Sequence, residues 1–300
     1  MSPNAAPNRA MSPSAAPTGG PAFGGAGLPL VLLHGFMGGP SCWRGMLEAA
    51  RLEAAAGETV AAPGPEILCP AILGHGEAAA EVRSFEDEVD RLAAVIRSRA
   101  SGSVHLLGYS MGGRLALGLA SRHPALIASL LLIGAHPGLE DPAARRARAA
   151  LDEARAEALE REGIEAFVRA WERLPLFATQ AALAGSGGAL EARLRAQRAR
   201  RLAHDPVALA RSLRLLGLGK MPCWLDALAS RPPPIRALVG ALDERFVALA
   251  ERLRERLGAQ VIALPGAGHN LLLERAEALA PLLLEWIGAP SSRLPAGARR

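Results

Sequence analysis

Short, mostly apolar runs alternate along this chain with segments of helical periodicity. Such runs, each with a glycine at or within two residues of its end, are typical of strands buried in a parallel sheet. They lie at 30–33, 67–73, 104–107, 126–133, 235–240 and 261–264. Between them apolar residues recur at helical spacing, as in Phe85, Val89 and Leu92 of segment 85–99, and a closing helix is expected around 276–287. The alternation predicts an α/β fold, a mostly parallel sheet with helices on both faces.

The alternation stops between residues 139 and 220. This segment consists of long Ala/Arg/Glu/Leu stretches without a strand pattern, and Asp141-Pro142 provides a helix start, a capping residue followed by proline. Because strand patterns resume after it, the helical block is inserted between two strands of one sheet. Substrates bind at the carboxyl ends of parallel strands, so we expect a lid over that edge. The predicted organisation is a core formed by 28–138 and 221–290 with a lid at 139–220.

The two ends of the chain differ from the rest. Residues 1–27 are rich in Ala, Pro, Ser and Gly, and the heptad MSPNAAP is nearly repeated as MSPSAAP. They lack the basic start and apolar core of a signal peptide. We predict a disordered tail there, with Met11 as an alternative start, and a loose tail at 291–300. No apolar run reaches the length of a membrane span, so no membrane insertion is expected and the cytoplasm is the expected location.

The net charge of +5 is carried almost wholly by arginine, since Lys220 is the only lysine. A basic balance can indicate nucleic-acid binding. Here the arginines alternate with Glu and Ala on predicted helices and aromatic residues make up only 4% of the chain, which favours arginines converging on a small acidic ligand instead. Cys42, Cys69 and Cys223 have neither metal-ligand nor disulfide spacing. The sequence carries no indication of oligomeric state.

A serine flanked by glycines lies between a strand pattern and a helix pattern, in Gly108-Tyr109-Ser110-Met111-Gly112. This arrangement is the nucleophile elbow. The turn is too tight for side chains at the two glycine positions. The serine precedes a helix whose free N–H groups favour negative charge. We therefore predict that Ser110 carries the chemistry.

A serine hydroxyl is weakly reactive until a histidine takes its proton and an acid fixes the tautomer of that histidine. In this type of fold the chain order is Ser, then Asp or Glu, then His. His269 follows the last strand and is predicted to reach the sheet edge of Ser110. Asp243 follows the preceding strand and is the predicted acid, with a helix N-cap as its alternative role. Asp205 and Asp226 are weaker candidates, because we assign them to the helical insertion.

Two further features flank the predicted serine site. Phe36 follows the first strand, and its N–H group is predicted to form an oxyanion hole with that of Met111, the alternative being a merely packed loop residue. Arg114 lies one helical turn after Ser110, on the same face. Because a buried guanidinium needs an acidic partner, Arg114 either grips a substrate carboxylate or forms a structural salt bridge to the lid.

Taken together, these motifs resemble the 2-succinyl-6-hydroxy-2,4-cyclohexadiene-1-carboxylate synthases of menaquinone biosynthesis, a family with the α/β-hydrolase fold. The resemblance runs from about Leu30 to Trp286. The motifs LHGFMG, GYSMGG and GAGHN occur in many α/β-hydrolases. More specific are Gly113-Arg114, HPGL at 136–139, WERLPLF at 171–177, SLR at 212–214 and PCW at 222–224.

The resemblance implies a role for each matching position and no metal or organic cofactor. Ser110, Asp243 and His269 match the family's catalytic triad. Contacts with substrate are implied for Tyr109, Arg114, Arg148, Arg201, Trp171, Phe177 and Trp224.

The implied reaction eliminates pyruvate from 2-succinyl-5-enolpyruvyl-6-hydroxy-3-cyclohexene-1-carboxylate. This small, multiply anionic substrate suits a site lined with arginines. Ser110 would act as a base on the carbon next to the succinyl carbonyl, and the oxyanion hole would hold the enolate. One alternative is an ordinary serine hydrolase of esters or thioesters, which would not need Arg114. The other is a non-catalytic binding protein, which would have no reason to keep the whole Ser-His-Asp set.

Overall fold

The structure is a computed structural model that describes residues 27–56, 65–76, 79–183 and 188–288. The predicted tails at 1–27 and 291–300 lie outside these ranges, apart from Gly27. Within the described ranges, no helix is long and apolar enough to span a bilayer. The same ranges contain no group of His, Cys, Asp and Glu side chains that could hold a metal ion.

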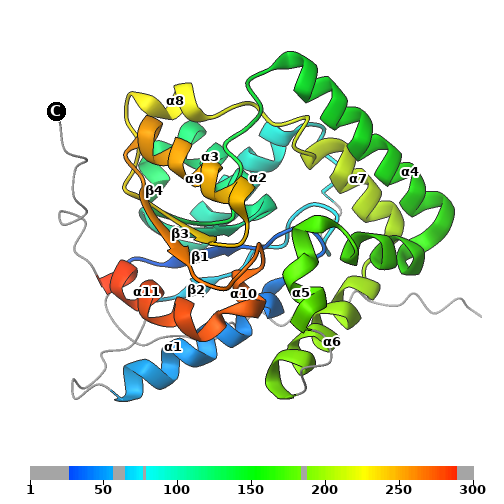
Figure 1. Cartoon of the computed structure of the whole chain (residues 1–300). Helices are drawn as coiled ribbons and strands as arrows, with labels where there is room; N and C mark the ends of the chain where they lie inside the picture. The colour runs from blue at the N-terminus through cyan, green and yellow to red at the C-terminus, as the bar shows by residue number, and fades with distance from the viewer. Residues whose placement is uncertain (1–26, 57–64, 77–78, 184–187, 289–300) are drawn as a thin grey trace, which may run out of the picture.

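The described strands form one six-stranded parallel sheet in the order β2-β1-β3-β4-β5-β6 (Figure 1). The predicted fold class is thereby confirmed. The strands are β1 (Leu30–Leu33), β2 (Ile67–Leu68), β3 (Val104–Tyr109), β4 (Ile127–Ile133), β5 (Ile235–Gly240) and β6 (Gln260–Leu264). The strand predicted at 67–73 is shorter than expected. Pro70 has no N–H group for a sheet ladder, which is consistent with pairing ending at Leu68.

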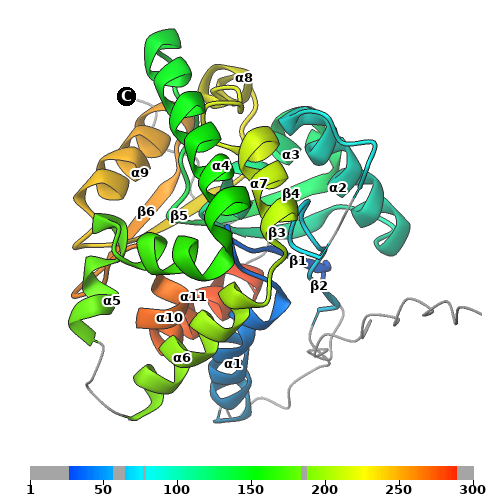
Figure 2. The same ribbon diagram turned by 90° about the vertical axis from the view of Figure 1, so that its right-hand side faces the viewer.

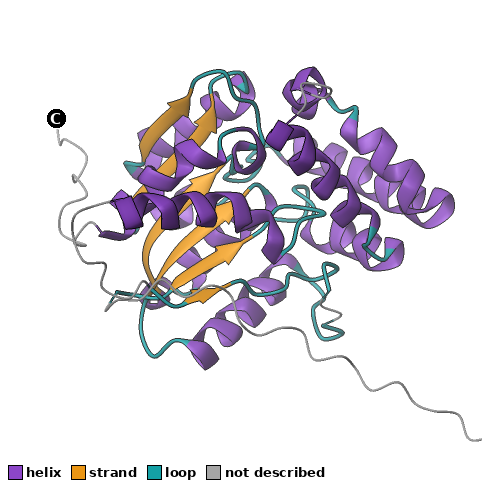
Figure 3. Ribbon diagram, turned by 90° about the horizontal axis from the view of Figure 1, so that it is seen from below, coloured by secondary structure: helices purple, strands orange, loops and turns teal. Residues whose placement is uncertain are grey.

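Alternate strand residues pack on two separate helical layers (Figure 3). Val31 and Leu33 of β1 face one core, and Leu30 and Leu32 face the other. The first layer contains α2 (Phe85–Arg99), α3 (Met111–Arg122), α8 (Leu225–Ala229) and α9 (Glu244–Leu257). The second contains α1 (Arg44–Ala56), α10 (Leu271–Glu274) and α11 (Ala276–Gly288). Burial on both faces explains why the strands are apolar runs instead of alternating patterns.

The described residues between β4 and β5 include no strand, and most of them form helices that lie to one side of the sheet (Figures 1 and 2). Apart from α8, which packs on the sheet, their α-helices fall within the range in which a lid is predicted. They are α4 (Pro142–Glu172), α5 (Ala178–Leu183), α6 (Gly188–Leu202) and α7 (Pro206–Leu216). Helices α4 and α7 enclose a small apolar core that also receives Met37, from the loop after β1. This packing ties the helical block to the loop that follows the first strand.

Candidate active site

Ser110 occupies the sharp turn between β3 and α3 in a backbone conformation that residues with side chains rarely adopt (φ 51°, ψ −107°). Its N–H group donates to the Ile133 carbonyl at 2.8 Å, which helps to hold the turn. A Cβ atom at Gly112 would lie only 1.9 Å from the Leu33 carbonyl oxygen, so this position requires glycine. The local geometry is that of a nucleophile elbow.

Ser110, His269 and Asp243 form one hydrogen-bonded chain. Nε2 of His269 is 3.1 Å from Oγ of Ser110, and Nδ1 is 2.9 Å from Oδ2 of Asp243. Because a carboxylate accepts, Nδ1 carries the proton and Nε2 is free to accept from the serine. The imidazole is buried and packs 4.4 Å from the Phe246 ring. A Cβ at Gly134 would come within 2.9 Å of the same ring, so the glycine leaves room for it.

Asp243 uses both carboxylate oxygens. Oδ2 accepts from His269, while Oδ1 accepts from the Phe246 N–H at 3.4 Å and caps α9. The two roles that the sequence left as alternatives therefore coexist. Neither weaker candidate approaches the histidine in this way, because Asp205 caps α7 and Asp226 pairs with Arg256.

The amides of Phe36 and Met111 have no hydrogen-bond acceptor among the described residues. Met111 begins α3, where backbone N–H groups have no partner within the helix. The loop that carries Phe36 is fixed by a hydrogen bond from the next residue, since the Met37 N–H donates to Nε2 of His75 at 2.9 Å. Burial lowers the pKa of His75 well below its usual value, so its imidazole stays neutral and can accept. The two free amides can therefore stabilise an oxyanion.

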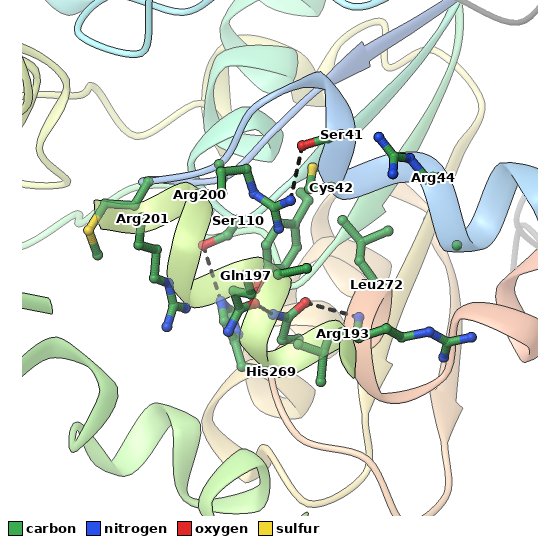
Figure 4. A pocket seen from close by; sticks show the side chains of 18 of the residues that line it. Ser41, Cys42, Arg44, Ser110, Arg193, Gln197, Arg200, Arg201, His269 and Leu272 are labelled. Carbon is green, nitrogen blue, oxygen red and sulfur yellow. Dashed lines mark hydrogen bonds between the residues drawn. The ribbon is translucent and has the colours of Figure 1, made fainter. Parts of the chain in front are cut away.

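Two cavities meet at the serine, of about 630 Å³ and 450 Å³. We call them the Arg200 cavity, which Figure 4 shows, and the Arg114 cavity. Both are lined by Phe36, Ser110, Trp171, Leu176 and His269. A ligand that reacts at Ser110 can thus extend in two directions.

Four of the residues that line the Arg114 cavity are arginines. Nη1 of Arg114 donates to the Leu216 carbonyl at 2.8 Å, and no carboxylate in the described part of the chain forms an ion pair with it. The contact with the helical block is therefore to a backbone oxygen, not a salt bridge. Burial, with Arg148 as the second cause, lowers the pKa of Arg114 to about 9, which leaves it charged at neutral pH. Arg148 also lines the cavity and donates through Nε to Asp152 at 2.9 Å.

The Arg200 cavity receives the remaining side chains expected to contact substrate, apart from Trp224. Tyr109, Arg201, Trp171 and Phe177 all line it. Arg201 pairs with Glu172 at 3.2 Å and lies over the Phe177 ring at 5.2 Å. Its charge is thus partly balanced within the protein.

Trp224 lines neither cavity, so the structure does not bring this residue to the serine site with the others. The side chain is buried in the core, where its ring lies 6.3 Å from that of Phe85. The backbone N–H group of Trp224 donates to the Pro137 carbonyl at 2.9 Å, and its ring packs beside Gly118 of α3. An indole at this place stabilises the junction between the helical block and the sheet.

Five arginines that the sequence did not single out also line the cavities, among them Arg44 and Arg193 of the Arg200 cavity. Arg155 and Arg245 line the Arg114 cavity, and Arg200 lines the Arg200 cavity. Arg155 shares Asp152 with Arg148 and lies 5.4 Å from the Trp171 ring. The spacing of Arg148 and Arg155, seven residues apart on one helix, could have shown that they share a face. No comparable signal separates Arg200 from its arginine-rich surroundings.

Comparison with known proteins agrees with this geometry. Residues 30–282 match the model of the alpha/beta hydrolase family. A putative 2-succinyl-6-hydroxy-2,4-cyclohexadiene-1-carboxylate synthase of Bacillus subtilis (strain 168) is 31% identical over 86% of this chain and 89% of the relative. The synthase of that name from Enterobacter sp. (strain 638) is 33% identical over 87% of this chain and 93% of the relative.

Solved structures give the same result. The structure of MenH from S. aureus matches with a TM-score of 0.77 and 27% identity, over 89% of this chain and 97% of the other. A thermophilic esterase from Thermogutta terrifontis shares the fold, with a TM-score of 0.69 and 24% identity over 89% of this chain and 92% of the other. The chain therefore belongs to the alpha/beta hydrolase family and, within it, to the 2-succinyl-6-hydroxy-2,4-cyclohexadiene-1-carboxylate synthases.

Proposed function

We propose that the protein forms 2-succinyl-6-hydroxy-2,4-cyclohexadiene-1-carboxylate by eliminating pyruvate from 2-succinyl-5-enolpyruvyl-6-hydroxy-3-cyclohexene-1-carboxylate, in the cytoplasm. The observation that carries the proposal is an aligned Ser110-His269-Asp243 chain between two arginine-lined cavities. The relatives named above support the same reaction. An ordinary esterase needs the serine, but it does not need arginines lining the cavities on both sides of the serine.

The reaction begins with a proton transfer. Asp243 holds His269 in the tautomer that accepts the Ser110 proton, and the serine oxygen then removes a proton from the carbon next to the succinyl carbonyl. The electron pair of that C–H bond moves onto the carbonyl oxygen and forms an enolate. The Phe36 and Met111 N–H groups stabilise its negative charge.

Elimination completes the reaction. The enolate re-forms its carbonyl and its electrons form a C=C bond between ring carbons 2 and 3. The existing double bond shifts from carbons 3 and 4 to carbons 4 and 5, and the C–O bond to the enolpyruvyl group on carbon 5 breaks. The leaving enolpyruvate receives the proton held by His269 and becomes pyruvate. The arginines bind the carboxylates of the substrate and hold the reacting carbon near Ser110. No step requires a metal or an organic cofactor.

The test is release of pyruvate from this substrate, coupled to lactate dehydrogenase, with ultraviolet detection of the diene in parallel. Arg114→Gln should lower kcat/KM by roughly 10- to 100-fold, the cost of losing a hydrogen-bonded charge. Arg122→Gln is the matched control, because Arg122 lies on the same helix and pairs with Asp90.

Two results would contradict the proposal. Hydrolysis of simple esters without pyruvate release would identify a serine hydrolase instead. Equal activity of the Arg114→Gln and Arg122→Gln proteins would show that Arg114 does not bind the substrate.

A further inference from the structure

Two of the arginines that line the Arg200 cavity have a counter-charge within the protein, and Arg200 has none in the part of the chain that the structure describes. Arg193 pairs with Glu277, and Arg201 pairs with Glu172. Arg200 forms no ion pair with any carboxylate of the described residues; its Nη1 donates to the Ser41 hydroxyl at 3.0 Å. Its Nε atom is buried without a hydrogen-bond partner.

The other groups around Arg200 do not neutralise it. Burial raises the pKa of the Cys42 thiol to about 11, so this side chain is uncharged at neutral pH. Arg44 lies close enough to oppose the charge of Arg200, and both arginines line the same cavity. Burial also lowers the pKa of the nearby His34 to about 4, so its imidazole is neutral. Partial burial of a guanidinium without a counter-charge raises the free energy of the protein, and binding of an acidic ligand would offset that increase.

The backbone accounts for this arrangement. Arg200 and Arg201 are adjacent in the last turn of α6, so their side chains leave the helix in different directions (Figure 4). Arg200 reaches Ser41 in the 3₁₀ helix at Pro40–Trp43, after β1, while Arg201 reaches Glu172 at the end of α4. The neighbouring arginines thus face different partners.

We propose that Arg200 and Ser41 form a carboxylate-binding subsite in the Arg200 cavity, separate from the arginines of the Arg114 cavity. The inference rests on the proposed function, because a substrate with several carboxylates around its reacting carbon needs cations on both sides of Ser110. The Arg200 guanidinium supplies the positive charge and the buried Nε–H donor. The Ser41 hydroxyl accepts from Nη1 and so orients the guanidinium. The ligand group is a carboxylate of the succinyl arm, the enolpyruvyl arm or the ring.

The test compares Arg200→Gln with Arg195→Gln, a control on the same helix whose exposed arginine pairs with Glu191. Arg200→Gln should raise KM roughly 10- to 100-fold and leave kcat within about threefold of wild type. Inhibition constants for succinate and pyruvate then identify the arm. A weaker succinate inhibition assigns the subsite to the succinyl arm, a weaker pyruvate inhibition to the enolpyruvyl arm, and a raised KM with neither change to the ring carboxylate.

A KM for Arg200→Gln equal to that of Arg195→Gln would overturn the subsite. If Arg200→Gln does not fold, Arg200→Lys decides by the same criterion, since it keeps the charge but not the fork. If the wild-type protein releases no pyruvate, the proposed function fails on its own. The subsite is then tested by calorimetric titration with succinate and pyruvate, where equal binding by wild type and Arg200→Gln overturns it and loss of binding in the variant supports it.

Discussion

At the scale of single residues, Asp243 shows how one side chain serves both chemistry and stability. One carboxylate oxygen accepts from His269 and the other from the Phe246 N–H, at the start of α9. The first contact orients a proposed base, and the second satisfies a helix amide that has no partner within the helix. The two contacts can be separated by substitution, because an asparagine can cap a helix but does not carry the charge.

Asp243→Asn should therefore lower kcat by roughly 10³- to 10⁴-fold, because the amide favours the wrong histidine tautomer. Its free energy of unfolding should stay within about 0.5 kcal/mol of wild type, while Asp243→Ala should lose about 1 kcal/mol through the missing cap. Pyruvate release and urea unfolding measure the two effects. Equal stability of the two variants would exclude a capping role, and near-normal turnover by Asp243→Asn would exclude the triad role.

At the scale of elements, the turn from β3 to α3 depends on the close approach of backbones. The start of α3 packs directly on the end of β1, since a Cβ on Gly112 would meet the Leu33 carbonyl carbon at 2.4 Å as well as its oxygen. The same contact brings the Met111 amide beside the loop that carries Phe36. The oxyanion hole is thus a consequence of how tightly this helix packs on that strand.

Gly112→Ala should consequently destabilise the protein by more than about 3 kcal/mol or prevent folding, because the helix has to move away from β1. Gly102→Ala is the control, since nothing lies within 4 Å of a Cβ at that position. It should change the free energy of unfolding by less than about 0.5 kcal/mol. Thermal and urea unfolding compare the variants, and a Gly112→Ala protein as stable as the control would contradict the packing argument.

At the scale of the whole molecule, several histidines are buried between the sheet and the helical block. Burial lowers the pKa of His34 to about 4 and that of His136 to about 3, and it lowers the pKa of His75 well below its usual value. The unfolded chain therefore takes up protons at a higher pH than the native protein does. The contribution of these histidines to stability is complete above the unfolded pKa of about 6.5 and is lost progressively as pH falls from there toward the native values.

We thus expect the free energy of unfolding to fall between pH 7 and pH 5, by about 2 kcal/mol for His34 alone. Carboxylates whose pKa is lowered by arginine, such as Asp90 and Glu277, lose their contribution only at lower pH, so this window isolates the histidines. Urea unfolding at several pH values measures the slope. A stability that is constant or rises toward pH 5 would show that the buried histidines are not neutral.

The sequence alone was enough to predict the parallel sheet, the elbow at Ser110 and the family, because these depend on apolar patterns and on sterics within a few residues. It also indicated the histidine and acid, since carboxyl ends of parallel strands share one edge. The sequence did not show that the Trp224 side chain is buried in the core. It also did not show that Arg201 pairs with a carboxylate while Arg200 does not. Arginines recur throughout the helical block, and which of them meets an acidic side chain depends on how helices distant along the chain pack together.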